Sequence, residues 1–255
     1  MTSVLHDSMR SVFMQPTNLK PPKLQQGETV GVIAPAGPVT PSEIQPGIKL
    51  LESFGYKVIV SPHLYQRQDY VAGDDETRLQ DLNAMLENQD VKVIFCARGG
   101  YGSLRLLEKI DFDLIRMNPK IIVGYSDITA LLLAIYKETG LVTFHGTMIK
   151  ELSKNKNRNL ASFLDLVSSD EMGKVDLARG KSLVPGMGEG TLLGGNLSLL
   201  CHLVGTPFMP SLKKSILFVE EKEEPLYRID RMMTHLRLSG QLKDLVGLVV
   251  GTFEG

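Results

Sequence analysis

Ser126 stands in a short turn where its hydroxyl could serve as a nucleophile. The segment before it, residues 121–123, is β-branched and predicts a buried strand, and the leucine-rich segment after it, residues 128–137, predicts a buried helix. Only residues 124–127 separate the two. A turn that tight pushes the serine hydroxyl out of the sheet and points the first N–H groups of the helix at any anion that forms beside it. The pattern indicates a nucleophile elbow.

A second interpretation of the same turn is a helix cap. Serine and aspartate are common N-cap residues, so Ser126 or Asp127 could do no more than accept hydrogen bonds from helix N–H groups. The second glycine of the usual Gly-x-Ser-x-Gly elbow is also absent, because Ile128 holds its position. The local sequence leaves both interpretations open.

A glycine-rich segment, residues 98–102, offers backbone N–H groups that few side chains shield, which suits an oxyanion or a phosphate. It matches neither the dinucleotide fingerprint nor a Walker loop, so nucleotide binding is disfavoured. The alternative is a flexible turn that needs positive φ angles.

Acidic and imidazole groups supply the other candidates. A predicted strand ends at Glu220, whose carboxylate is aimed at the end of the sheet, and Glu221 is the runner-up. Of the five histidines, His145 alone is placed like a catalytic base, although a structural role suits it as well. No His-x-x-x-His or Cys-x-x-Cys spacing occurs, so neither a metal nor another cofactor is expected.

The elements that must position these groups alternate between strand and helix. Strands are predicted at residues 29–34, 56–60, 91–97, 121–123 and 141–144, and helices at residues 42–54, 74–86, 104–110 and 128–137. The alternation predicts an α/β fold with a parallel sheet that is covered on both faces. Ligands of such sheets bind at the carboxyl ends of the strands, where residues 35–37, residues 98–102 and Ser126 fall.

The chain is expected to divide into three parts. Residues 1–22 are polar and predict a poorly ordered arm, residues 23–165 form the nucleophile-bearing unit, and residues 175–255 form a smaller unit. Residues 150–170 are predicted to be a partly helical linker. Strands are expected in the smaller unit at residues 181–184, 191–193, 215–220 and 248–253. Because the chain stops just after an apolar strand, we expect this unit to be incomplete.

Composition excludes several classes of protein. A net charge of -1 gives no basic field for nucleic acid or anionic lipid, and no apolar run reaches the roughly 20 residues that a membrane helix needs. The N-terminal residues lack the apolar segment of a secretory signal. Cys96 and Cys201 lie in apolar surroundings, which suits free thiols. A cytoplasmic location is expected.

Several independent motifs, from about residue 22 to the last residue, resemble those of the LD-carboxypeptidases in order and spacing. These serine peptidases include the cytoplasmic muramoyltetrapeptide carboxypeptidases and the microcin-immunity peptidases. The motifs are Arg98-Gly99-Gly100-Tyr101-Gly102, Gly124-Tyr125-Ser126-Asp127-Ile128-Thr129-Ala130, His145-Gly146, Leu193-Gly194-Gly195-Asn196-Leu197, Phe218-Val219-Glu220 and Pro225-Leu226-Tyr227-Arg228-Ile229-Asp230-Arg231-Met232.

The resemblance implies a three-layer N-terminal α/β domain and a smaller C-terminal domain with a mixed sheet, with the active site between them. It assigns Ser126 as the nucleophile, and the N–H group of Asp127 with one from Gly99 or Gly100 as the oxyanion hole. Glu220 would orient the histidine of a Ser-Glu-His triad. That histidine lies downstream of residues 251–253 in the family, so we expect this chain to lack its base and to be nearly inactive.

The implied reaction removes a C-terminal D-alanine from murein tetrapeptides during peptidoglycan recycling. We expect Arg98 to bind the free carboxylate of that D-alanine and Tyr101 to contact the substrate. The resemblance also allows a homodimer, and it gives His145 no catalytic role. Two rival interpretations are a catalytically inert muropeptide binder and a thiol enzyme with Cys96 as the nucleophile.

Overall fold

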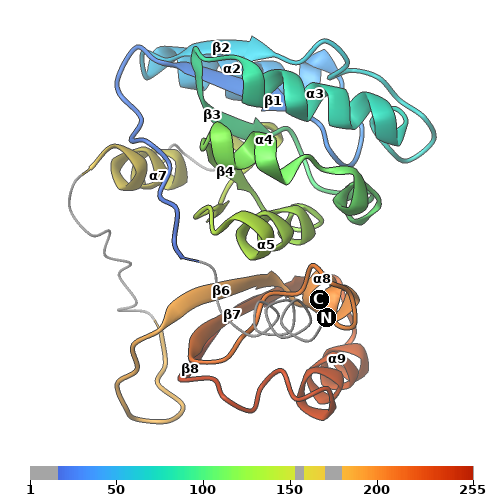
Figure 1. Ribbon diagram of the computed structural model, residues 1–255, viewed down its shortest axis with the longest axis vertical. Coiled ribbons are helices and arrows are strands. Elements are labelled where there is room, and N and C mark those ends of the chain that lie inside the picture. Colours follow the sequence, from blue (N-terminus) through green and yellow to red (C-terminus); the bar gives the residue numbers. More distant parts are fainter. Residues whose placement is uncertain (1–16, 153–157, 170–179, 255) are drawn as a thin grey trace, which may run out of the picture.

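Two parallel sheets form the framework of the molecule. The computed structural model describes residues 17–152, 158–169 and 180–254 (Figure 1). The larger sheet has five strands in the order β2-β1-β3-β4-β5, and the smaller has three in the order β6-β7-β8. The strands are β1 (Thr29–Ile33), β2 (Lys57–Val60), β3 (Val91–Cys96), β4 (Ile121–Gly124), β5 (Phe144–His145), β6 (Thr191–Asn196), β7 (Ser215–Lys222) and β8 (Gly247–Glu254).

Helices cover both faces of the larger sheet, as the α/β prediction requires. They are α2 (Pro41–Ser53), α3 (Asp75–Glu87), η1 (Ser103–Lys109), α4 (Phe112–Met117), α5 (Ile128–Thr139), α6 (Ile149–Leu152) and α7 (Arg158–Ser168). Alternate residues of each strand point to opposite faces. On β3, Val93 and Phe95 join the core cluster under α2, α6 and α7, while Ile94 and Cys96 join the cluster under α3, α4 and α5. The N-terminal unit is therefore a three-layer sandwich.

Helix α7 corrects the prediction of a linker at residues 150–170. Leu160, Phe163, Leu164 and Val167 are buried in the core cluster of the larger sheet. The ring of Phe163 lies 5.4 Å from that of Phe95 and 5.8 Å from that of Phe144. Residues 150–170 are partly helical as expected, but α7 is an integral outer layer of the N-terminal unit.

The smaller sheet is parallel, whereas the resemblance implied a mixed one. Every residue pairing of β7 with β6 and with β8 is parallel, because α8 (Leu197–Leu203) and α9 (Leu226–Leu238) return the chain to the same edge between successive strands. The strand expected at residues 181–184 is wrong, since residues 180–190 are exposed and irregular.

Smaller differences from the sequence predictions concern η1, β5 and the residues before β1. The expected helix at residues 104–110 is the 3₁₀ helix η1, and the last strand of the large sheet is the short β5. Leu19, in the expected arm, pairs with the backbone around Leu141 through hydrogen bonds from Leu19 N to Gly140 O and from Val142 N to Leu19 O. The rest of the arm prediction, residues 1–16, and part of the expected boundary at residues 165–175 lie outside the described residues.

Helix α5 lies between the two sheets (Figure 1) and joins them into one core. Leu131 and Leu132 of α5 belong to the same cluster of buried side chains as Leu193 and Leu217 of the smaller sheet. The Thr129 hydroxyl at the start of α5 accepts a hydrogen bond of 3.1 Å from the backbone N–H of Asn196. None of the described helices has the length and apolar character needed to cross a membrane.

Candidate active site

The turn around Ser126 has the backbone geometry of an elbow. Strand β4 ends at Gly124 and α5 begins at Ile128, and Ser126 between them has a φ of 61°, in the left-handed region that non-glycine residues rarely adopt. Asp127 occupies the N-cap position of α5, but its side chain makes no cap hydrogen bond. This geometry does not support the cap interpretation for Asp127 and matches the strained strand-to-helix turn of a nucleophile elbow.

The glycine loop, residues 98–102, lies directly against Ser126. A Cβ atom placed on Gly99 would stand 3.0 Å from both Cβ and Oγ of Ser126, so only glycine leaves the hydroxyl room. The backbone N–H groups of Gly99, Gly100 and Asp127 donate no hydrogen bond to any residue that the structure describes. Asp127 follows Ser126 in the chain, and Gly99 and Gly100 belong to the loop that packs against it. These three unpaired N–H groups could therefore donate hydrogen bonds to an oxyanion that forms at Ser126.

Two buried side chains, to which sequence reasoning gave no such role, hold the glycine loop in place: Arg78, and Asp127, which was named only for its backbone N–H group or as a helix cap. The Arg78 side chain is 2% exposed and donates through Nη1 to the carbonyl oxygens of Pro35 at 2.6 Å and Gly102 at 3.0 Å. The carboxylate of Asp127 accepts a hydrogen bond of 2.9 Å from the backbone N–H of Ser103. These bonds join the loops that follow β1, β3 and β4 at the carboxyl edge of the sheet.

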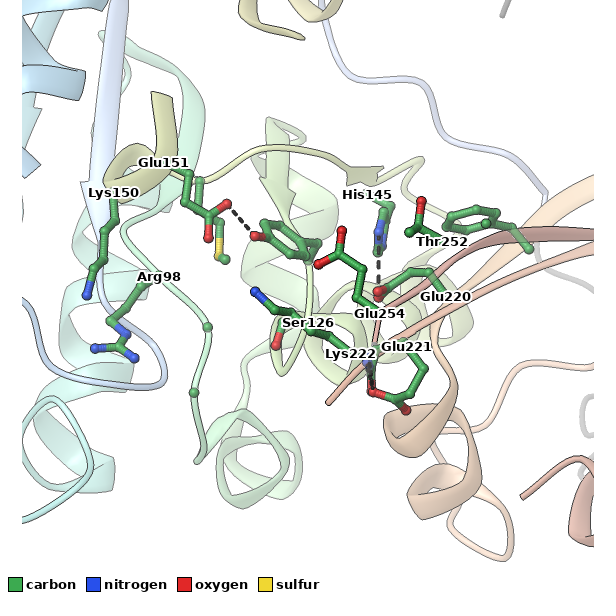
Figure 2. A pocket seen from close by; sticks show the side chains of 17 residues that line it. Arg98, Ser126, His145, Lys150, Glu151, Glu220, Glu221, Lys222, Thr252 and Glu254 are labelled. Carbon is green, nitrogen blue, oxygen red and sulfur yellow. Dashed lines mark hydrogen bonds and ion pairs between the residues drawn. The ribbon is translucent and has the colours of Figure 1, made fainter. Parts of the chain in front are cut away.

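Glu220 lies on β7 of the smaller sheet, and its side chain points toward His145 of the larger sheet. Its Oε1 atom is buried, accepts no hydrogen bond from the described residues, and lies 4.0 Å from Nε2 of His145 (Figure 2). Burial, and then the neighbouring carboxylate of Glu221, raise the pKa of Glu220 above its usual value. A buried carboxylate oxygen without a donor has the capacity to orient an imidazole.

His145 lies at the end of β5 between two aromatic rings. Its ring centroid is 5.9 Å from that of Tyr125 and 5.3 Å from that of Phe218. Burial lowers the pKa of His145 to about 4, so the imidazole is neutral at neutral pH. The imidazole ring thus packs against Tyr125, which follows β4 of the larger sheet, and against Phe218 on β7 of the smaller sheet, beside Glu220.

Glu221, the runner-up acid, is occupied by structural hydrogen bonds. Its carboxylate accepts hydrogen bonds from Asn196 Nδ2 at 2.8 Å, from the Ser198 backbone N–H at 2.9 Å and from the Ser198 hydroxyl at 2.7 Å. It therefore fixes the start of α8 to β7, and the two adjacent carboxylates have different environments.

A cavity of about 820 Å³ lies between the sheets and contains most of the predicted residues. Figure 2 places Arg98 and Lys150 at one end, His145, Glu220 and Thr252 at the other, and Ser126 between them. The lining comprises Arg98, Gly99, Gly100, Tyr125, Ser126, His145, Met148, Lys150, Glu151, Asn196, Phe218, Glu220, Glu221, Lys222, Gly251, Thr252 and Glu254. Sequence reasoning had given no role in a site to Tyr125, Met148, Lys150, Glu151, Lys222 or Glu254.

Two predicted residues are not part of the lining. Asp127 is buried behind the elbow, where only its backbone N–H remains relevant to the cavity. Tyr101 does not line the cavity either: its ring packs edge-on against Tyr70, with 5.4 Å between the ring centroids, on an exposed surface. Direct contact of Tyr101 with a substrate in this cavity is thus unsupported.

Thiol and metal chemistry find no support in the described part of the chain. Cys96, the last residue of β3, is fully buried in the core, and burial raises the pKa of its thiol far above the usual value, which is the opposite of an activated nucleophile. The thiol-enzyme interpretation is therefore wrong. Among the described residues, no cluster of histidine, cysteine and acidic side chains could hold a metal ion.

Comparison with known proteins points to one family along most of the chain. The model of the LD-carboxypeptidase N-terminal domain matches residues 30–146, and that of the LD-carboxypeptidase C-terminal domain matches residues 189–255. The chain is 41% identical to a probable murein peptide carboxypeptidase of Bacillus subtilis, covering 96% of this chain and 78% of the relative. It is 31% identical to the murein tetrapeptide carboxypeptidase of Pseudomonas aeruginosa, covering 88% and 76%.

Solved structures agree with this grouping. The muramoyltetrapeptide carboxypeptidase from Oxalobacter formigenes superimposes with a TM-score of 0.80 at 36% identity, covering 89% of this chain and 77% of that one. The wild-type microcin C7 self-immunity protein MccF superimposes with a TM-score of 0.83 at 27% identity, covering 92% and 80%.

Proposed function

Because the chain belongs to the LD-carboxypeptidase family and is a carboxypeptidase, we propose that it acts as a serine-type enzyme on murein peptides. It hydrolyses the amide bond between an L-configured centre and the C-terminal D-alanine of a murein tetrapeptide. One observation carries the proposal: Ser126, in a left-handed turn, shares a cavity with unpaired backbone N–H donors and the buried carboxylate of Glu220. The names of the relatives from Bacillus subtilis and Pseudomonas aeruginosa favour this substrate class.

The reaction proceeds through an acyl-enzyme. The Ser126 hydroxyl attacks the carbonyl carbon, and its proton passes to an imidazole that Glu220 orients. The carbonyl oxygen becomes an oxyanion that accepts hydrogen bonds from the N–H groups of Asp127 and of Gly99 or Gly100. The C–N bond then breaks, the imidazole returns the proton to the amine of D-alanine, and a water molecule hydrolyses the ester to release the tripeptide.

His145 is a poor candidate for that imidazole. Its Nε2 atom is 4.0 Å from Glu220 Oε1, beyond hydrogen-bond distance, and a pKa of about 4 makes it a weak proton acceptor at neutral pH. The oxygen of Glu220 remains available to another imidazole. That a histidine following residue 255 supplies it stays a prediction.

The proposed reaction also implies a cellular setting for the enzyme. Trimming of tetrapeptides to tripeptides belongs to peptidoglycan recycling, and we place the activity in the cytoplasm, where recycled muropeptides arrive. We retain the division into units at residues 23–165 and 175–255, with the first unit extended to Ser168 by α7, and the homodimer as parts of the proposal. Neither nucleic acid nor a membrane surface is a proposed partner, because the net charge of -1 offers no basic field.

Release of D-alanine from a purified murein tetrapeptide, followed by mass spectrometry, tests the proposal in a protein that carries the triad histidine implied by the resemblance together with residues 1–255. Ser126→Ala should lower the rate by about 10³-fold or more, because the nucleophile is lost. Ser182→Ala, at an exposed serine outside the cavity, is the matched control and should leave the rate unchanged. A fluorophosphonate probe should label wild-type Ser126. Tight tetrapeptide binding without labelling or turnover would favour the rival of an inert binder.

A further inference from the structure

A second hollow, of about 590 Å³, adjoins the cavity and is lined by residues of the N-terminal unit. It is lined by Gly37, Pro38, Val39, Thr40, Glu43, Tyr65, Arg67, Asp69, Tyr70, Arg98 and Gly100. Only Arg98 and Gly100 line both the cavity and this second hollow. Since Gly100 has no side chain, Arg98 is the shared lining residue whose side chain can separate the two spaces.

The guanidinium of Arg98 is held in that position. Its Nη1 atom donates to the carbonyl oxygen of Pro38 at 3.3 Å. A Cβ atom on Gly37 would lie 3.1 Å from Nε of Arg98, so the side chain rests closely against the turn after β1. Arg98 is half-buried, and its position depends on the backbone of residues 37 and 38.

Arg98 also differs in charge pairing from the lysines of the cavity. Lys150 Nζ lies 2.6 Å from Glu43 Oε1, and Lys222 Nζ lies 3.9 Å from Glu223 Oε1. Arg98 has no carboxylate within 4.0 Å in the described part of the chain. A half-buried guanidinium with unused donors is suited to bind a carboxylate of the substrate.

We propose that Arg98 determines how many residues may follow the scissile bond. It binds the carboxylate of a single C-terminal residue and closes the passage to the second hollow, which has room for one more residue. This inference rests on the proposed function, in which Ser126 attacks beside the glycine loop. An additional residue would extend the leaving group by about 3.5 Å and would replace the carboxylate at Arg98 with a neutral amide, which forms a weaker hydrogen bond.

The test compares two substrates that share the same scissile bond. The first is a murein tetrapeptide, which releases D-alanine, and the second is the pentapeptide with a further D-alanine, which would release the dipeptide. The wild-type enzyme should strongly prefer the tetrapeptide. Arg98→Ala should raise KM for the tetrapeptide and shift the ratio of the two kcat/KM values toward the pentapeptide by about tenfold or more, because it removes both the charge and the barrier.

Two further variants separate charge from bulk. Arg98→Gln keeps much of the side-chain volume without the charge, so it should raise KM for the tetrapeptide while shifting the substrate ratio less than Arg98→Ala. Arg237→Ala, at an exposed arginine near the end of α9, is the matched control and should change neither value. Thermal unfolding of each variant verifies that the fold is retained.

The outcomes separate this inference from the proposed function. An unchanged substrate ratio in Arg98→Ala, or equal wild-type cleavage of the two peptides, would overturn the role of Arg98 while leaving the serine mechanism intact. Retention of full activity by Ser126→Ala would instead overturn the proposed function, whatever the substrate ratio is.

Discussion

The carboxylate of Asp127 accepts the backbone N–H of Ser103 at 2.9 Å, and the backbone carbonyl of Asp127 accepts the Ser103 hydroxyl at 2.5 Å. Asp127 follows the nucleophile, and Ser103 follows the glycine loop. Both are buried. The two bonds therefore hold the serine and the nearby N–H donors in one rigid unit at the carboxyl edge of the sheet.

Replacing this carboxylate should damage catalysis and stability together. Asp127→Ala leaves the buried N–H of Ser103 without an acceptor, which costs about 1–3 kcal/mol of unfolding free energy. The elbow and the glycine loop would also shift relative to each other, and a misplacement of about 1 Å can lower kcat by about 10²-fold. Asp127→Asn retains an acceptor oxygen and should be milder on both measures. Equal effects of the two variants, measured by urea unfolding and D-alanine release, would contradict this role.

A methyl group at Gly99 should obstruct the nucleophile without disturbing the fold. Gly99→Ala places its Cβ atom 3.0 Å from Ser126 Oγ, so the hydroxyl must move away from its position beside the N–H donors. We expect kcat to fall by about 10²-fold with little change in melting temperature. Gly186→Ala is the control, since a Cβ there meets nothing within 4 Å. Full activity of Gly99→Ala would remove the glycine loop from the catalytic arrangement.

The two adjacent glutamates should respond in opposite ways to the same substitution. Glu220→Gln keeps the shape but weakens the orientation of an imidazole, so kcat should fall by about 10²- to 10⁴-fold at nearly constant stability. Glu221→Gln sets an amide N–H₂ group against the donors of Asn196 and Ser198, and should cost about 1–3 kcal/mol of unfolding free energy. Kinetics and chemical denaturation of both variants distinguish the roles, and a reversed pattern would exchange them.

His145 should make the protein less stable as the pH falls from about 6.5 to about 4. In this range the unfolded imidazole binds a proton, whereas the folded imidazole, with its pKa lowered by burial to about 4, does not. Protonation therefore favours the unfolded state, and stability rises again with pH. Removing the titrating group, as in His145→Asn, should flatten this part of the curve of unfolding free energy against pH.

The neighbouring Glu220 titrates in the opposite sense, because its folded pKa is raised and the folded state takes up a proton first as the pH falls. The comparison is therefore made with Glu220→Gln present in both proteins. Identical pH profiles with and without His145 would show that the pKa of this imidazole is the same in the folded and unfolded states, contrary to the prediction.

Local patterns in the sequence were sufficient for most of the elements but not for their tertiary partners. The β-branched run of β4 and the leucines of α5 predicted the elbow, because strand and helix are each specified by neighbouring residues. The spacing of Leu160, Phe163, Leu164 and Val167 is also that of an amphipathic helix, and it could have identified α7 as a packed layer.

The contacts of the site join residues far apart in the chain and leave no periodic signal. In the sequence, Arg78 looks like any charged residue of a helix, although its guanidinium donates hydrogen bonds to the loops after β1 and β3. Asn196 and Glu221 are 25 positions apart. The sequence ranked Glu220 above Glu221 because a predicted strand ends at Glu220, whereas β7 continues to Lys222, so the different roles follow from the hydrogen bonds of Glu221 and not from the strand end. Which of two adjacent carboxylates is free depends on tertiary structure, which a single sequence does not encode locally.

The helix that follows the nucleophile also carries the apolar contact between the two sheets. If the smaller sheet unfolded, the leucines of α5 would lose their apolar contacts with β6 and α8. If the larger sheet unfolded, β6 and α8 would lose the same contacts with α5. The molecule should therefore denature in a single cooperative step, with catalysis and circular dichroism lost at the same urea concentration.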